Sequence, residues 1–135
     1  MRNGTSRVPA APERELDGRW SNGEGSTLDL EVHDDGWVTG TFRSASDGSS
    51  YRPYRVNGTY TERQEGGRGV VGSVVGWPRA TSITVWTGEY DPVTDQLRTS
   101  WLTTAGDGEG DQRAPTVGRE IFRRSARPRS MARAG

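Results

Sequence analysis

The chain has 135 residues, a length that suits one domain, with 18 basic and 18 acidic residues and a formal net charge of zero. This balance excludes a global attraction to nucleic acid or anionic lipid, and the absence of cysteine excludes disulfides, thiolate nucleophiles and cysteine-ligated metals. Hydrophobic residues make up only 30% of the chain and 19 residues are glycine, so we expect a small core and many turns.

Both ends of the chain have the composition of tails. Residues 1–15 are polar and lack the apolar stretch of a secretory signal, and residues 125–135 are basic without an acid. We expect two flexible tails around one domain at 16–124, although the basic tail could instead dock on a partner or a neighbouring subunit. No apolar run approaches the length of a membrane helix, so we expect no membrane partner.

Between the tails, short β-forming runs alternate with turn clusters such as NGEG, DDG and DGEGDQ. In chain order we expect strands at 18–22, 26–34, 37–45, 54–62, 68–77, 81–91, 96–106 and 115–125. Short breaks join antiparallel neighbours, and no helical period appears. Eight such strands predict an all-β fold, an eight-stranded antiparallel up-and-down β-barrel, wide enough inside for one small ligand. An open sandwich remains the alternative.

The strand at 81–91 mixes polar and apolar residues on both faces. Ser82, Thr84 and Trp86 share one face, while Ile83 and Val85 share the other. With Trp86 inside a barrel, the same parity on the other strands turns these residues inward: Trp20, Asn22, Ser26, Leu28, Phe42, Ser44, Val75, Trp77, Trp101, Thr103, Glu120 and Phe122. Buried polar groups need partners, so hydroxyls beside indoles favour a small-molecule pocket, unless they bond to backbone or trapped water. Trp20 we expect in the core.

The opposite parity leaves large apolar side chains on the outside of the late strands. They are Ile83, Val85, Leu102, Val117 and Ile121. A contiguous exposed patch of this kind indicates a protein interface, and therefore a homo-oligomer, dimer or tetramer, in which barrels pack side by side.

Four segments, GRWSNGEGSTLDL, WVTGTFRSA, SITVWTGEY and LRTSWLTTAG, resemble the matching strands of the avidin and streptavidin family, in family order and over roughly 16–124. The resemblance implies an eight-stranded barrel that binds biotin at one end and assembles as a dimer or tetramer. It also suggests secretion, although the chain shows no signal peptide and localisation stays open.

Carried over by position, the resemblance implies a set of contacts to the ureido ring of biotin. Asn22 and Ser26 would donate to the ureido oxygen, and Ser44 would accept from one ureido nitrogen. Phe42 stands where the family usually has a tyrosine that gives a third donor, and Glu120 stands where the family has an aspartate. Losing a donor to a buried acceptor costs about 1–3 kcal/mol, so we expect weaker binding than in typical members.

The resemblance also implies contacts to the rest of the ligand. Thr84 would face the ring sulfur, and Ser82 and the backbone near Gly48 would meet the valerate carboxylate. Thr103 replaces an apolar contact. The aromatic box would be Trp77, Trp86 and Trp101. The connection at 107–116 contains no tryptophan to act as a lid, so we expect a more open pocket.

The function expected from these residues is non-enzymatic biotin binding, with biotin as ligand and no cofactor; the alternative is an avidin-like barrel for another small ligand or a peptide. Hydrolysis would need a base beside a nucleophile. His33, the only histidine, lies away from the pocket by parity, and Glu120 has no evident acid partner. We expect no metal. We also expect no nucleic-acid partner, because the Arg cluster is confined to a tail and the aromatic residues face inward.

Overall fold

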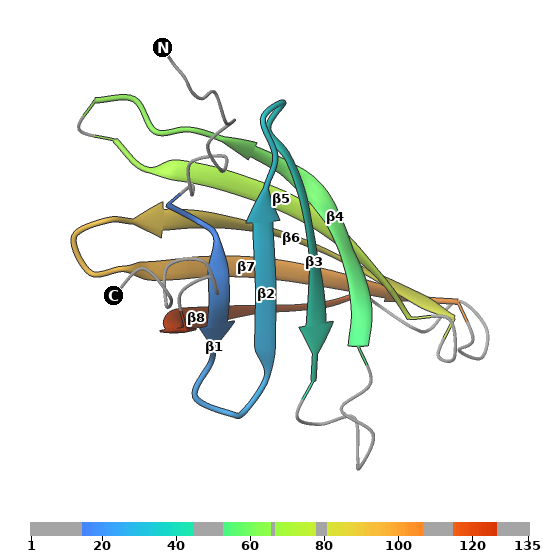
Figure 1. Cartoon of the computed structure of the whole chain (residues 1–135). Helices are drawn as coiled ribbons and strands as arrows, with labels where there is room; N and C mark the ends of the chain where they lie inside the picture. The colour runs from blue at the N-terminus through green and yellow to red at the C-terminus, as the bar shows by residue number, and fades with distance from the viewer. Residues whose placement is uncertain (1–14, 45–52, 66, 78–80, 107–114, 127–135) are drawn as a thin grey trace, which may run out of the picture.

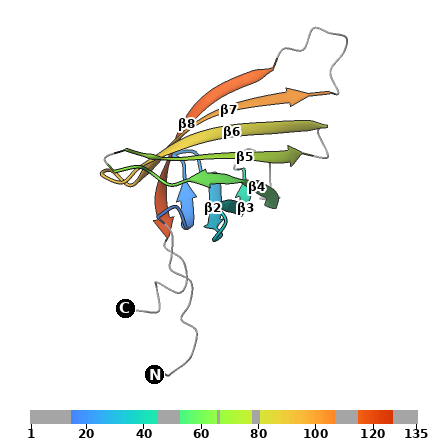
Figure 2. The same ribbon diagram turned by 90° about the horizontal axis from the view of Figure 1, so that it is seen from above.

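Eight strands in chain order close into a barrel in the computed structural model, in which each strand pairs with its sequence neighbour and the last strand pairs with the first (Figures 1 and 2). The described residues are 15–44, 53–65, 67–77, 81–106 and 115–126. The strands are β1 (Gly18–Ser21), β2 (Thr27–Val32), β3 (Trp37–Arg43), β4 (Pro53–Thr61), β5 (Gly69–Trp77), β6 (Ser82–Asp91), β7 (Gln96–Ala105) and β8 (Thr116–Ala126). The predicted antiparallel up-and-down barrel is therefore confirmed, and the open sandwich is excluded.

The predicted and observed boundaries differ in the first and the last strand. β1 ends at Ser21 rather than at residue 22, and β8 continues to Ala126, beyond the predicted domain end at 124. Glu15, expected as the last residue of a tail, accepts hydrogen bonds from Tyr60 and Arg63. The other residues of the predicted tails, apart from Ser125 and Ala126, lie outside the described residues.

The seam between β1 and β8 is short. Only three residue pairs join these strands, with a register shift between Arg19 and Trp20. The β8 residues before Arg123 pair with β7 alone. This half of β8 therefore extends past β1, and the turn that follows β1 lies beside it.

The hydrophobic core draws residues from all eight strands. Trp20 is fully buried, as expected, and its Nε1 donates to the carbonyl of Leu16. The guanidinium of Arg124, only 5% exposed, lies 4.3 Å from the Trp20 ring centroid and pairs with Asp95. Cation–π contact and an ion pair together compensate for the burial of this charge.

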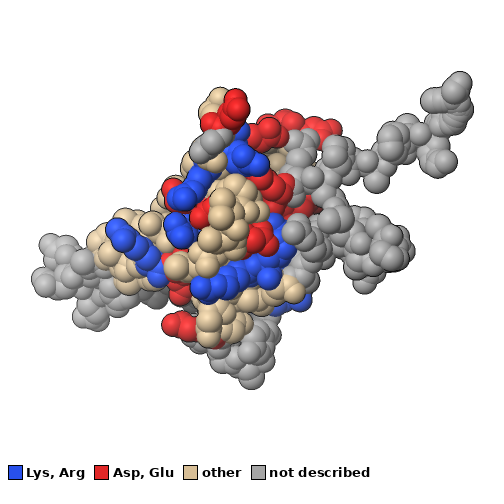
Figure 3. All heavy atoms as spheres, turned by 90° about the vertical axis from the view of Figure 1, so that its left-hand side faces the viewer, with Lys and Arg blue, Asp and Glu red and all other residues tan. Residues whose placement is uncertain are grey.

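Charged side chains alternate in sign over the end of the molecule where the β4–β5 and β6–β7 turns lie (Figure 3). Arg68 pairs with Glu89 and Asp91, and Arg98 also approaches Asp91. Local pairing of this kind gives no single-sign surface on the view shown.

Within the described ranges, no helix is long and apolar enough to span a membrane.

An apolar row crosses the outer face of the late strands. The register pairs Val74 with Val85, Val85 with Leu102, and Leu102 with Val117, so the four side chains lie in line over β5 to β8. Each of the four is at least 39% exposed. The five outward residues expected from parity are all exposed, which bears out the alternation on β6 to β8.

Candidate functional site

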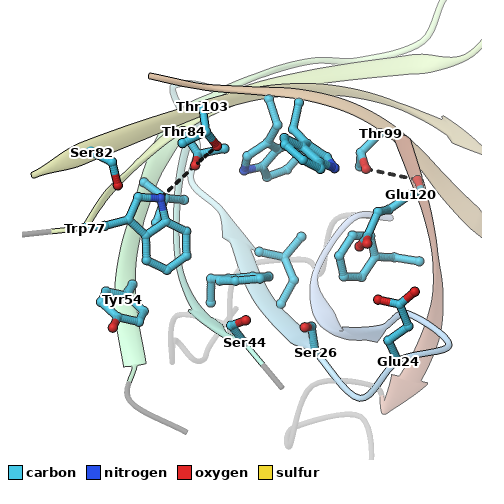
Figure 4. Close-up of a pocket in the computed structure, with 16 residues that line it drawn as sticks. Glu24, Ser26, Ser44, Tyr54, Trp77, Ser82, Thr84, Thr99, Thr103 and Glu120 are labelled. Atoms are coloured by element: carbon cyan, nitrogen blue, oxygen red, sulfur yellow. Dashed lines mark hydrogen bonds between the residues drawn. The ribbon is translucent and has the colours of Figure 1, made fainter. Parts of the chain in front are cut away.

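A cavity of about 760 Å³ opens inside the barrel (Figure 4). The predicted site residues that line it are Ser26, Phe42, Ser44, Trp77, Ser82, Thr84, Trp86, Trp101, Thr103 and Glu120. Asn22 does not line it, and Gly48 lies outside the described residues. Side chains from five strands, β3 and β5 to β8, and from two adjoining connections thus converge on one cavity whose size is typical of small-molecule sites.

The register explains why hydroxyls and indoles occupy neighbouring places. On the inner face of β6 and β7, Trp86 pairs with Trp101, and Thr84 pairs with Thr103. Because strand residues two apart share a face, each of the two strands presents one tryptophan and one threonine toward the cavity. The result is an aromatic layer with a hydroxyl layer directly beside it.

The two threonine hydroxyls are hydrogen-bonded to each other and to the indole of Trp77. Trp77 Nε1 donates to Thr84 Oγ1 at 2.7 Å, and Thr84 Oγ1 lies 2.5 Å from Thr103 Oγ1. The indole hydrogen and two hydroxyl hydrogens are available for two bonds, so one hydroxyl hydrogen remains for a ligand atom. Thr103 therefore joins the hydrogen bonds of Trp77 and Thr84. The three side chains together keep one hydroxyl hydrogen that can donate to a ligand.

Asn22 departs from its expected place. It follows the last residue of β1, and its Oδ1 accepts from the backbone amides of Glu24 at 2.9 Å and Ser26 at 3.0 Å. Its Nδ2 donates to Glu120 Oε1 at 2.5 Å. Strand alternation does not apply in a turn, where Asn commonly bonds to the backbone, and this is the physical reason for the difference.

The aromatic wall contains a residue that the sequence reasoning missed. Tyr54 lines the cavity, with its ring centroid 4.4 Å from that of Trp77. Phe42 meets the same indole edge to face at 5.7 Å. Tyr54 pairs with Phe42 across β3 and β4, so the parity of Phe42 could have identified it.

Two more polar residues at the cavity were also missed. Thr99, two residues before Trp101 on β7, donates through Oγ1 to the carbonyl of Glu120 at 3.0 Å. Glu24 comes from the turn after β1, where no periodicity could assign it. In Figure 4, Glu24, Thr99 and Glu120 lie on one side of the cavity and Tyr54 and Trp77 lie on the other.

The histidine expected away from the pocket does not line the cavity. His33 Nε2 lies 2.8 Å from Thr39 Oγ1. In the described ranges, no three His, Cys, Asp or Glu residues are grouped in a way that could hold a metal ion. The polar chemistry that the cavity offers is therefore hydrogen bonding and carboxylate charge.

Comparison with known proteins identifies the family. The family model described as "Avidin family" matches residues 10–125. Among solved structures, the crystal structure of Xenavidin matches with a TM-score of 0.68 at 29% sequence identity, covering 84% of this chain and 100% of that chain. A family model that spans most of the sequence, together with the same closed barrel, shows that the chain belongs to the avidin family.

Proposed function

We propose that this protein is a non-enzymatic biotin-binding protein that holds the ureido ring at the polar side of its barrel cavity. The observation that carries the proposal is the convergence of Ser26, Ser44, Thr84 and the tryptophans on one cavity. Flat rings enclose an apolar ring system at low entropy cost, and fixed hydroxyls preorganise hydrogen bonds to a urea. Membership of the avidin family supports the same ligand.

Binding is proposed to be weaker than in typical family members. Phe42 lines the cavity without a donor, and Asn22 donates to Glu120. The Asn22 amide nitrogen keeps its second hydrogen, so the donor that a urea oxygen lacks is the one at position 42. A missing hydrogen bond costs about 1–3 kcal/mol, or roughly one to two decades in affinity. The alternative ligand is a different small molecule or a peptide in the same cavity.

Calorimetric titration of the purified protein with biotin tests the proposal. We expect saturable heat with one site per chain, and loss of that heat in Trp101→Ala. Trp37→Ala is the matched control, because Trp37 is half exposed and does not line the cavity. Absence of heat, together with an unchanged melting temperature on adding biotin, would refute biotin as the ligand and favour the alternative.

We further propose that the partner of this chain is a second copy of itself. The exposed row of Val74, Val85, Leu102 and Val117 supports this proposal, because a contiguous apolar row across four strands is costly to leave in water. The proposed assembly is a dimer or tetramer in which these outer faces pack together. No nucleic acid or membrane partner is proposed.

A further inference from the structure

The outer face of β5 to β8 is organised in rows that cross the four strands. Figures 1 and 2 show these strands side by side. The register places one outward residue of each strand in every row. In the order β5 to β8, the charged row is Val70, Glu89, Arg98 and Ile121, the small row is Gly72, Thr87, Ser100 and Arg119, and the apolar row is Val74, Val85, Leu102 and Val117.

These rows suit a second copy of the same face, related by a two-fold axis. An axis that runs along the strands, between β6 and β7, places β6 opposite β7 of the second copy and β5 opposite β8. Each row then lies opposite the same row of the second copy. In an isologous interface of this kind, the face must be complementary to itself.

The apolar side chains meet one another under this operation. The contacts are Val85 with Leu102, Val74 with Val117 and, at the ends of the charged row, Val70 with Ile121. All six side chains are between 39% and 67% exposed in the single chain. Packing them together therefore removes a continuous apolar area from water.

The small row has space for the one long side chain that it contains. Arg119 lies opposite Gly72 of the second copy, so its stem can pack over bare backbone while its guanidinium stays in water. A glycine inside a strand weakens the strand, yet a Cβ at position 72 would meet its nearest atoms at an ordinary 3.7 Å. The single chain thus gives no steric reason for this glycine, whereas the second copy does.

The charged row supplies complementary charges. Glu89 lies opposite Arg98 of the second copy, and the two-fold axis generates the same pair again. The side chains of Glu89 and Arg98 are 46% and 44% exposed. Within the described residues, Arg98 approaches a carboxylate only at 3.9 Å, that of Asp91, so its guanidinium can turn toward the second copy.

The charges also select among the possible orientations. An axis across the strands, along the small row, would instead place Glu89 opposite Val85 and Arg98 opposite Leu102. Each charge would then be buried against an apolar side chain without a partner, which is costly. Complementary charges in this way fix the relative orientation of two faces.

We propose that two copies of this chain pack face to face around a two-fold axis along the strands between β6 and β7, with Glu89 of each copy paired with Arg98 of the other. The inference rests on the proposed self-association. It goes beyond that proposal by assigning the symmetry of the interface and the two residues that fix its orientation.

Two single charge reversals test the pairing. Glu89→Arg brings two arginines opposite each other, and Arg98→Glu brings two glutamates opposite each other. We expect each variant to raise the dissociation constant of the assembly about a hundredfold, because the interface contains the pair twice and each pair changes from attraction to repulsion. Sedimentation over a range of concentrations measures this constant. Glu31→Arg and Arg55→Glu, at exposed outer positions of β2 and β4, are the matched controls and should leave it unchanged.

A mixture of the two reversed variants separates a contact between copies from an effect within one chain. In a mixed dimer, both pairs between copies again join an arginine to a glutamate. We therefore expect equal amounts of Glu89→Arg and Arg98→Glu to associate with a dissociation constant close to that of the parent protein. Native mass spectrometry should show the mixed species in excess over either variant alone.

The outcomes separate this inference from the proposed self-association. A parent protein with the mass of a single chain would refute both. A parent assembly that neither reversal weakens, or two weakened variants that do not associate with each other when mixed, would overturn the inference and leave self-association intact. Weakened variants that recover on mixing support the proposed axis and the pair of Glu89 with Arg98.

Discussion

The indole of Trp101 lies against the backbone of Gly118, its direct partner across β7 and β8. A Cβ at position 118 would overlap the six-membered ring of that indole, well inside van der Waals contact. Because position 118 has no side chain, the Trp101 indole can occupy this space and form one wall of the cavity. An absent side chain on one strand sets the position of the largest side chain on the next.

Replacing this glycine tests the relationship. We expect Gly118→Ala to displace Trp101, to weaken biotin binding and to lower the free energy of unfolding by about 1–3 kcal/mol, as overpacking does. Urea unfolding and calorimetry measure the two effects. Gly76→Ala is the matched control, because a Cβ there would meet nothing within 4 Å. Equal behaviour of the two variants would contradict the packing argument.

Phe42→Tyr is expected to strengthen biotin binding. The ring lines the cavity, and a hydroxyl there would add a donor for the ureido oxygen. One hydrogen bond to a buried acceptor is worth about 1–3 kcal/mol, so the dissociation constant should fall by roughly one to two decades. Calorimetry on the variant and the parent protein provides the comparison. An unchanged or weaker affinity would show that the ureido oxygen does not lie near position 42.

The outer apolar row predicts an oligomer in solution. Light scattering should give at least twice the chain mass of 14.8 kDa. Val85→Glu puts a charge in the middle of the row and should shift the mass toward that of one chain. Val93→Glu, at a 90% exposed turn residue outside the row, should leave the mass unchanged. A single-chain mass for the parent protein would rule out the interface.

Alkaline conditions should destabilise the barrel through Tyr60. Burial raises the pKa of this phenol, and the hydrogen bond to Glu15 raises it further. The folded protein then keeps a proton that the unfolded chain releases above roughly pH 10. The contribution of Tyr60 is full below that pH and falls by about 1.4 kcal/mol per pH unit above it. Urea unfolding from neutral to alkaline pH should show a shallower loss in Tyr60→Phe; an identical slope would dismiss the assignment.

Thr81, the turn residue before β6, has a strained conformation. Its φ of 49° lies in the left-handed region that β-branched residues avoid. Thr81→Gly removes strain worth about 1–3 kcal/mol, against an entropy cost of about 0.5–1 kcal/mol, so a net gain of about 1 kcal/mol is expected in chemical denaturation. Thr87→Gly, on the outer face of β6, should instead destabilise. Destabilisation by both would mean that the φ at 81 costs nothing.

Strand alternation made much of the site predictable. The pleat fixes which face Thr84, Trp86 and Trp101 occupy, so one correct choice on β6 assigned the neighbouring strands as well. The same rule could have identified Tyr54 and Thr99. The positions of Asn22 and Glu24 could not be obtained in this way, because a turn has no period and the Asn22 amide is oriented by the backbone that it bonds.

The three-pair seam has a consequence for how the barrel assembles. Seven of the eight strand pairings join sequence neighbours and can form as local hairpins, whereas the seam joins segments as far apart as Asp17 and Arg124, 107 residues. The contacts that must compensate for the entropy cost of closing so long a loop belong to the shortest ladder of the barrel. Arg124 reinforces it by donating to the carbonyls of Glu15 and Asp17 while its guanidinium covers Trp20. We therefore expect the ring to close last and to open first, so that unfolding begins with the separation of β1 from β8.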